Sequence, residues 1–302
     1  MARSPRASRL ATALLLAAIV ALPGTTSGAP ATPVTPVSVL AAAPDADWAT
    51  LDPHDLLVID LAGGGRVVIL LADNFAPVHV ANIRKLAAAR WYDGLAIERV
   101  QDNYVVQWGD PDGRKPLPSG IVQPTPAEYD RPAAGVVFTP LRFADTYARK
   151  VGLFGALPMA EGGGRAWLTH CYGTVGVGRD LNPDTGTGAE LYAVIGTPPR
   201  QLDRNIAVVG RVLAGIDTIA ALPRGTADMS FYADPKQRTP IVWVRIAADL
   251  PLAEQPHFQV LDVHSTSFRA WLHAKANRQD TFFVRPAGAL DVCNALPPVR
   301  TR

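Results

Sequence analysis

The fold is decided by residues 91–111, which read WYDGLAIERVQDNYVVQWGDP. The Tyr-Asp-Gly turn at its start ends the segment before it, and two short apolar runs follow at 95–100 and 104–108. The residues between the runs, Gln-Asp-Asn, are polar and typical of a tight connection. This stretch therefore predicts two short strands, with Arg99 on the first and Gln107 on the second.

The segments on either side continue the pattern of short apolar runs. Two apolar runs, at 56–61 and 67–71, flank Gly63-Gly64-Gly65, which is typical of a β-hairpin. The absence of a following GK[ST] motif argues against a phosphate-binding loop. Apolar residues at helical spacing after Pro77 predict a helix over 76–90. Further strands are predicted at 173–178, 191–195, 206–213 and 241–246, with a second helix at 216–222. Many short strands with two helices predict a closed antiparallel β-barrel with helical plugs.

The first 28 residues have the composition of a secretory signal peptide. Arg3, Arg6 and Arg9 form a positive region, 13 apolar residues occupy 10–22, and small residues lead to a cleavage site after Gly28. Thirteen apolar residues are too few for a free-standing membrane span, although an uncleaved anchor is the alternative. Removing this acid-free segment changes the formal charge of the chain from +2 to −1. A nearly neutral chain without Lys/Arg runs argues against nucleic acid as a partner.

The motifs of several enzyme classes are missing. The chain has no GxSxG, HExxH or CxxC, which argues against serine hydrolases and zinc hydrolases. The six histidines lack ligand spacing, and the His170-Cys171 pair is weak evidence for a metal and favours a structural role. Cys171 and Cys293 are the two cysteines of the chain. They can form one bridge in an oxidising compartment, and two unpaired thiols are the alternative, because sequence does not give their distance.

Four separate blocks, in preserved order, resemble the cyclophilin-type peptidyl-prolyl isomerases. They are APVHVANI at 76–83, the stretch 91–111, GAELYAV at 188–194, and Leu202-Asp203 followed by GRVLAGID at 210–217. The resemblance covers about residues 55–110 and 173–247. It implies a mainly β fold, a closed eight-stranded antiparallel barrel capped by two helices, with a proline-binding groove on its outer face. It implies no cofactor and no metal.

Composition and the resemblance together divide the chain. We expect a signal peptide over 1–28, a flexible Ala/Pro/Thr-rich linker over 29–50, a cyclophilin-like domain over 51–249 and a small C-terminal extension over 250–302. The stretch at about 112–172 is longer than the family pattern and is expected to be a central insertion in the domain.

Site residues follow from the resemblance, position by position. Arg99 matches the family's catalytic arginine, which favours the resonance-broken amide by donating to the prolyl nitrogen. Gln107 matches a groove glutamine, and Glu190 stands where a second, neutral glutamine is usual. We expect Glu190 to pair with Arg99 and its pKa to be lowered by that charge, the alternative being that it points to solvent or to Arg179. The apolar pocket is matched by Tyr104, Val105, Tyr192 and Leu202.

Other positions depart from the family pattern. Glu98 replaces a histidine, Trp108 a glycine, Gly178-Arg179 an Ala-Asn pair, Gln201 an aromatic residue and Ile206 a histidine. We expect these changes to alter substrate contacts and to leave the fold unchanged. The resemblance implies a peptidyl-prolyl cis-trans isomerase that acts on proline-containing unfolded or exported polypeptides, and we expect a monomer. The signal peptide predicts that it is exported, to the periplasm or by secretion, without stable membrane insertion. The departures leave open a second function, a catalytically weak module that binds proline-containing segments.

Overall fold

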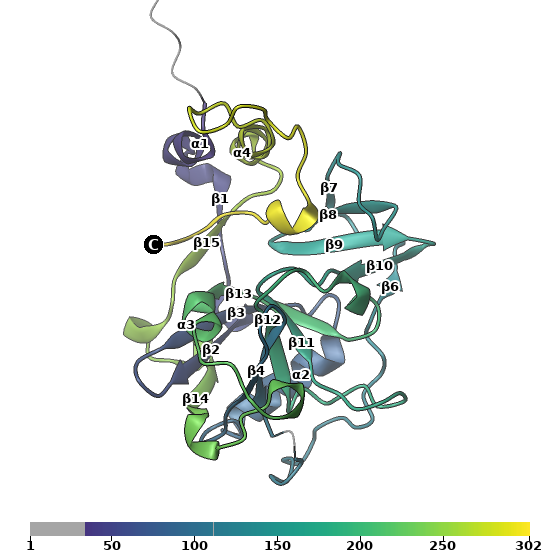
Figure 1. Ribbon diagram of the computed structural model, residues 1–302, viewed down its shortest axis with the longest axis vertical. Helices are drawn as coiled ribbons and strands as arrows, with labels where there is room; N and C mark the ends of the chain where they lie inside the picture. Colours follow the sequence, from purple (N-terminus) through teal and green to yellow (C-terminus); the bar gives the residue numbers. More distant parts are fainter. Residues whose placement is uncertain (1–33, 111) are drawn as a thin grey trace, which may run out of the picture. The chain divides into compact units, whose positions relative to one another are not determined.

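The computed structural model describes residues 34–110 and 112–302 of the chain. Eight strands of this part close into an antiparallel barrel, which confirms the predicted fold (Figure 1). In hydrogen-bonded order they are β11 (Thr174–Val177), β12 (Leu191–Val194), β5 (Val105–Gly109), β4 (Ala96–Val100), β14 (Thr239–Ile246), β2 (Leu56–Leu61), β3 (Arg66–Leu71) and β13 (Val208–Ala214). Because β13 pairs back onto β11, the barrel has no free edge.

Two helices pack against the barrel interior, as predicted. Helix α2 (Pro77–Ala88) begins with a proline in its first turn, where the missing N–H costs nothing. Its apolar face, including Val80 and Ile83, is fully buried in the same cluster as the inward side chains of the strands. Helix α3 (Ile216–Ala220) contributes Ile219 to this cluster. No helix of the described residues is long and apolar enough to cross a membrane.

Strands β2 and β3 are buried on both faces. Side chains alternate between the two faces of a strand. Leu57 and Ile59 therefore belong to the barrel interior, whereas Leu56 and Val58 belong to a second cluster on the outside of the barrel. This outer cluster also contains Leu157, Met159, Phe258 and Val260, which come from the two segments outside the cyclophilin-like pattern. The unbroken apolar runs of β2 and β3 thus indicate an outer face that is covered.

The central insertion supplies part of this cover. Its strands form a five-stranded antiparallel sheet in the order β6 (Arg131–Pro132), β10 (Arg165–Leu168), β9 (Leu157–Gly162), β8 (Lys150–Phe154) and β7 (Thr139–Pro140). None of these strands was predicted between residues 110 and 173. Two of them, β6 and β7, are two residues long and contain proline, which gives no period-two signal.

The expected flexible linker over 29–50 is wrong for its described part. Residues 36–42 form helix α1 (Pro36–Ala42), which Thr35 caps, and β1 (Trp48–Thr50) pairs with β15 (Phe258–Leu261). Strand β16 (Val299–Thr301) completes this three-stranded sheet, and α1 packs against α4 (Thr266–Ala276) (Figure 1). The extension thus takes its partner elements from the segment before the barrel, and an Ala/Pro/Thr-rich composition could not indicate this long-range pairing.

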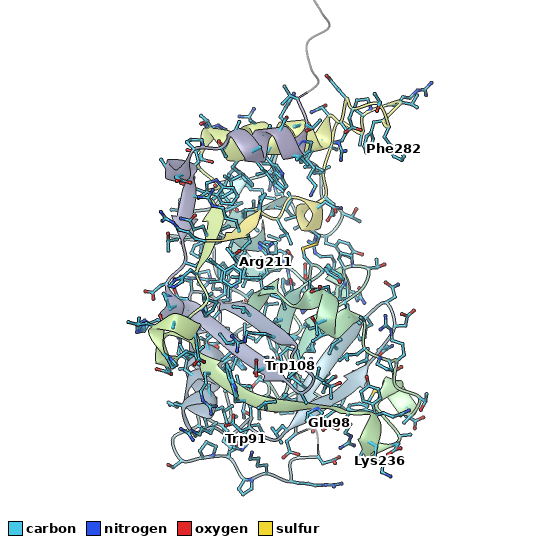
Figure 2. The ribbon with its side chains drawn as sticks, turned by 90° about the vertical axis from the view of Figure 1, so that its left-hand side faces the viewer. Trp91, Glu98, Trp108, Arg211, Lys236 and Phe282 are labelled. Carbon is cyan, nitrogen blue, oxygen red and sulfur yellow. A yellow bond between two sulfur atoms is a disulfide. The ribbon has the colours of Figure 1, made fainter. Side chains whose placement is uncertain are left out.

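One covalent and one polar link connect the added segments: a disulfide joins the end of the insertion to the extension, and an arginine of the barrel contacts both. Cys171 and Cys293 form a disulfide, which settles the alternatives that the sequence left open. Arg211 of β13, labelled in Figure 2, donates to the carbonyl of Ala156 at 2.9 Å and lies 3.5 Å from that of Pro297. Burial lowers the pKa of this guanidinium to about 10. One side chain of the barrel therefore contacts the backbone of both added segments.

Candidate active site

The strand register places the candidate residues in one row across the barrel. Arg99 on β4 pairs with Gln107 on β5, Gln107 pairs with Tyr192 on β12, and Tyr192 pairs with Gly176 on β11. Directly paired residues put their side chains on the same face. The neighbours Val106 and Trp108 belong to the barrel interior, so this row faces outward.

A cavity of about 110 Å³ opens over this row. Six of the seven predicted site residues line it, and Glu190 is the exception. The complete lining is Arg99, Tyr104, Val105, Gln107, Val177, Gly178, Arg179, Tyr192, Leu202 and Ile206. Val105, Tyr192 and Val194 form a small apolar cluster beneath it, with Tyr104 and Ile206 packed at its side. The structure thus brings an arginine and an amide to the rim of an apolar hollow.

Arg99 is held by three acceptors. Its Nε donates to the carbonyl of Met229 at 2.6 Å, its Nη1 donates to Gln107 Oε1 at 3.0 Å, and its Nη2 donates to Gln101 Oε1. The guanidinium also lies over the rings of Tyr104 and Phe231, 5.7 and 5.6 Å from their centroids. Burial lowers the pKa of Arg99, but an arginine stays protonated at neutral pH. A guanidinium has five N–H groups, so two remain for a ligand.

Glu190 does not pair with Arg99, and this expectation is wrong. Its Oε1 accepts a hydrogen bond from Gln107 Nε2, and the Oε1 of Gln107 faces Arg99. The amide therefore separates the carboxylate from the guanidinium. The expected pKa direction is also wrong: burial raises the pKa of Glu190, and the hydrogen bond from Gln107 offsets only part of that effect. Within the described residues Glu190 makes no ion pair with Arg179 either; Arg179 donates to the carbonyl of Asn205 at 3.0 Å.

The departures from the family pattern divide into two groups. Trp108 packs in the barrel interior, and Glu98 forms an ion pair with Arg238 at 2.8 Å, so neither lines the cavity (Figure 2). Alternation along β5 turns Trp108 into the interior, and Glu98 is the extra residue at a register shift between Ile97 and Arg99, so neither change alters the lining of this cavity. Gly178, Arg179 and Ile206 do line the cavity. A Cβ on Gly178 would lie 2.7 Å from Cγ of Glu190, so the glycine leaves room for the Glu190 side chain.

Sequence reasoning missed the residues that support the row from outside the matched blocks. Met229 comes from a short turn that is 130 residues from Arg99 in sequence, and no local pattern indicates that contact. His170, which the sequence favoured as structural, is fully buried behind Tyr192. In residues 34–110 and 112–302 no group of three or more His, Cys, Asp or Glu side chains could hold a metal ion.

Comparison with known proteins agrees with this geometry. The family model described as cyclophilin type peptidyl-prolyl cis-trans isomerase/CLD matches residues 56–246. A Brucella suis protein named "Probable peptidyl-prolyl cis-trans isomerase" is 26% identical over 175 residues, which are 58% of this chain and 74% of that protein. A Synechocystis protein named "Putative thylakoid lumen peptidyl-prolyl cis-trans isomerase" is 26% identical over 179 residues, 53% of this chain and 42% of its own length.

Among solved structures, cyclophilin AquaCyp293 from Hirschia baltica has the same fold. Its TM-score is 0.66 at 24% identity, and the match covers 89% of this chain and 98% of that chain. The match of the family model spans more than half of the sequence and includes every strand of the barrel. The chain therefore belongs to the family of cyclophilin-type peptidyl-prolyl cis-trans isomerases.

Proposed function

We propose that the chain accelerates X–Pro isomerisation in exported, proline-containing polypeptides, and that Arg99 stabilises the twisted amide. The observation that carries this proposal is the row of Arg99, Gln107 and Tyr192 at one cavity. The barrier to amide rotation is about 18–20 kcal/mol, because rotation breaks the resonance of the C–N bond. A donor aimed at the prolyl nitrogen stabilises the pyramidal form in which that resonance is lost.

The surroundings of Arg99 suit this role. Three of its N–H groups are taken by Met229, Gln107 and Gln101, which orient the guanidinium before a substrate arrives. A donor that is already oriented in a partly dry site needs no reorganisation during the reaction. The apolar cluster of Val105 and Tyr192 would hold the pyrrolidine ring by burial of its CH₂ groups.

One observation favours the second candidate function, a weak module that binds proline-containing segments. The Nε2 of Gln107 donates to Glu190, so this amide has one N–H fewer to offer a substrate carbonyl. A protease-coupled assay on Ala-Ala-Pro-Phe p-nitroanilide separates the two functions. Catalysis above the spontaneous rate supports the isomerase, and saturable peptide binding without catalysis supports the module.

Replacing Glu190 with glutamine should raise kcat/KM severalfold. In wild type the carboxylate holds the N–H₂ group of Gln107, whereas a glutamine at 190 can both donate and accept, which lets Gln107 turn toward a substrate carbonyl. Arg179→Asn is the matched variant, because Arg179 lines the same cavity but does not touch Gln107. A Glu190→Gln enzyme slower than wild type contradicts this interpretation and makes the carboxylate a useful part of the groove.

The same pair of enzymes should converge as the pH falls. Burial raises the pKa of Glu190, so its carboxyl takes up a proton at a higher pH than an exposed glutamate does. A protonated glutamate resembles glutamine in having both a donor and an acceptor. The ratio of kcat/KM values, Glu190→Gln to wild type, should therefore be largest at neutral pH and approach one in acid. A ratio that stays constant between neutral and acid pH contradicts this.

Export is part of the proposal and has its own test. The positive region, the 13-residue apolar run and the small residues before Ala29 support cleavage near residue 28; this segment lies outside the described residues. The Cys171–Cys293 disulfide suits an oxidising compartment such as the periplasm. The printed name of the Synechocystis relative places that protein in the thylakoid lumen, which is consistent with export. We expect N-terminal sequencing of exported protein to start near Ala29, and soluble protein that starts at Met1 would refute cleavage.

A further inference from the structure

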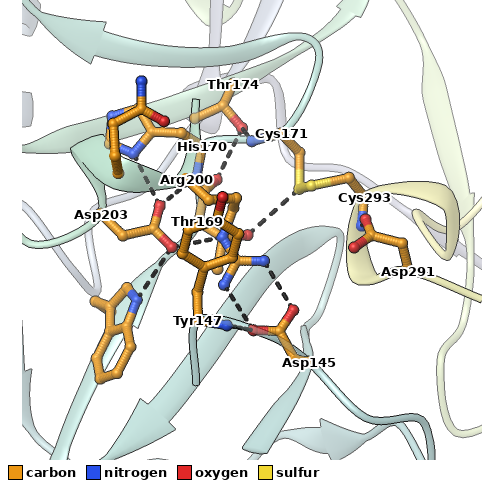
Figure 3. A network of polar contacts seen from close by, with 12 residues as sticks. Asp145, Tyr147, Thr169, His170, Cys171, Thr174, Arg200, Asp203, Asp291 and Cys293 are labelled. Carbon is orange, nitrogen blue, oxygen red and sulfur yellow. Dashed lines mark hydrogen bonds and ion pairs between the residues drawn. A yellow bond between two sulfur atoms is a disulfide. The ribbon is translucent and has the colours of Figure 1, made fainter. Parts of the chain in front are cut away.

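A buried chain of polar side chains connects the central insertion to the candidate groove. Figure 3 shows the part of it around His170, Asp203, Arg200 and Asp145. His170 lies in the turn after β10 and is completely buried. Its Nε2 lies 2.9 Å from the hydroxyl of Tyr192, and its Nδ1 lies 3.1 Å from Oδ1 of Asp203. Tyr192 lines the cavity, and Asp203 follows the cavity residue Leu202 in sequence. The chain of contacts therefore reaches the groove at two places, directly at Tyr192 and next to Leu202.

The direction of these hydrogen bonds follows from the acceptor character of the carboxylate. An ionised aspartate only accepts, so Nδ1 of His170 carries the proton and donates to Asp203. In the neutral ring Nε2 is then the acceptor, and the Tyr192 hydroxyl donates to it. The backbone N–H of His170 also donates to Asp203 Oδ1 at 2.9 Å, so that both the ring and the main chain are fixed.

Asp203 is itself held in the ionised state. Burial alone would raise its pKa, but the hydrogen bonds from His170 and the charge of Arg200 keep the pKa below its usual range. Arg200 Nε donates to Asp203 Oδ2 at 2.6 Å. The other end of the guanidinium makes a two-pronged pair with Asp145 of the insertion, at 2.9 and 3.1 Å. Because the Arg200 and Asp145 side chains are only 3% and 4% exposed, this arrangement has little freedom to move.

The other side of His170 is held covalently. The next residue, Cys171, forms the disulfide with Cys293 of the C-terminal extension. Thr174 accepts from the Cys171 N–H at 3.0 Å and donates to the Thr169 carbonyl at 3.0 Å, which closes the turn around His170. The imidazole is therefore fixed by groups from the barrel, the insertion and the extension together.

The strand opposite Tyr192 carries a glycine at the point where the tyrosine hydroxyl lies. A Cβ on Gly176, the cross-strand partner of Tyr192, would lie 2.3 Å from the tyrosine oxygen. The hydroxyl thus lies between a glycine and His170. A phenol without these constraints could rotate about its side-chain bonds into the 110 Å³ cavity beside it.

We propose that His170 is a positioning residue for this enzyme: it fixes the ring of Tyr192 as a wall of the proline pocket, and Asp203 fixes His170. The proposal rests on the proposed function, since it assigns the cavity to proline. His170 touches no substrate in this arrangement. It acts through one hydrogen bond to a residue that does, and that bond keeps the pocket open before the peptide binds.

The test is a double-mutant cycle on His170→Leu and Tyr192→Phe. Each variant removes one partner of the bond, and we expect each to raise KM for Ala-Ala-Pro-Phe p-nitroanilide about fivefold to tenfold with kcat within twofold of wild type. The double variant should be no worse than the poorer single variant, because the two residues act as one unit. A purely structural role for His170 would instead lower the melting temperature of His170→Leu and leave its KM within twofold of wild type. That result, or KM effects of the two variants that add, overturns the proposal.

His79→Leu is the matched control. His79 is also fully buried, with Nδ1 2.7 Å from Glu128 and Nε2 3.1 Å from the Thr185 carbonyl, but it does not contact the row. We expect it to lower the melting temperature and to leave KM of the folded enzyme unchanged. Tyr192→Phe keeps the ring and should fold even if His170→Leu does not. A KM for Tyr192→Phe within twofold of wild type would also overturn the proposal.

Peptide binding separates failure of this proposal from failure of the proposed function. The Kd for the same peptide is measured by NMR titration, which needs no turnover. If wild type binds the peptide but does not catalyse isomerisation, the isomerase function fails while the Kd values of the variants still test His170. We then expect the Kd to rise about fivefold to tenfold in both single variants, and unchanged Kd values contradict the positioning role.

Discussion

Replacing Arg99 with alanine should lower kcat/KM by about 10²–10³-fold, the loss seen when one preorganised donor is removed from a transition state. Arg99 is the charged member of the row with Gln107 and Tyr192, and two of its N–H groups are left over, so nothing else in the row replaces it. The second arginine of the cavity lining, Arg179, is turned to the carbonyls of Asp180 and Asn205. The loss should fall on kcat, because the donor acts on the pyramidal nitrogen more than on the planar amide. The measurement is the protease-coupled rate over a range of enzyme concentrations.

Two variants make this result specific. Arg99→Lys keeps the positive charge but lacks the planar fork that reaches Met229, Gln107 and a substrate together, so it should recover little of the activity. Arg66→Ala removes another half-exposed arginine, which pairs with Asp60 on the β2–β3 side of the barrel, across from β5 and β12. It should leave kcat/KM unchanged. Wild-type turnover in Arg99→Ala, with an unchanged melting temperature, would eliminate the proposed mechanism.

Removing the disulfide should have the largest effect on stability. The bridge joins residues 122 positions apart, and closing a loop of that size restricts the unfolded chain by about 3 to 5 kcal/mol. We expect Cys171→Ala with Cys293→Ala to lose this free energy of unfolding and to melt on the order of 10 °C lower. Alanine is the replacement of choice because Cys171 is completely buried, and a serine hydroxyl would need a partner there.

Reduction of the wild-type protein is the matched control for this variant. These are the two cysteines of the chain, so dithiothreitol should lower the melting temperature of wild type to that of the double variant. The variant itself should not respond to dithiothreitol. A double variant that melts within 1–2 °C of oxidised wild type would show that packing of η8 (Val292–Asn294) against Cys171, and not the covalent link, holds the extension.

The barrel strands were predicted to within a few residues because their signals are local. Strand β2 was predicted at 56–61 and is found there, and the turn at Gly94 and the loop at 101–103 lie where the sequence predicts them. The cyclophilin-like motifs then related these strands to one another. They predicted that Arg99 and Gln107 belong to one groove, and the strand register pairs these two residues directly.

For Glu190 both the predicted partner and the predicted pKa direction were wrong. The motif placed its carboxylate near the arginine, but the amide of Gln107 lies between them, and burial raises the pKa of the carboxyl. Both outcomes depend on side-chain geometry and on how much water reaches the group, and neither quantity is a property of residue spacing. Residue spacing also could not predict the structure of segment 34–50, because β1 becomes a strand only by pairing with β15, which lies more than 200 residues later in the sequence.

Alternation, turn chemistry and motif order are properties of neighbouring residues, and they were enough to predict the barrel, its two capping helices and six of the residues that line one cavity. The tertiary structure alone decided what covers the outer face of β2 and β3, whether the cysteines pair, and that His170 meets Tyr192. These contacts join segments whose composition is typical of loops or linkers. The burial that gives them their energy exists only after the barrel, the insertion and the extension have packed together.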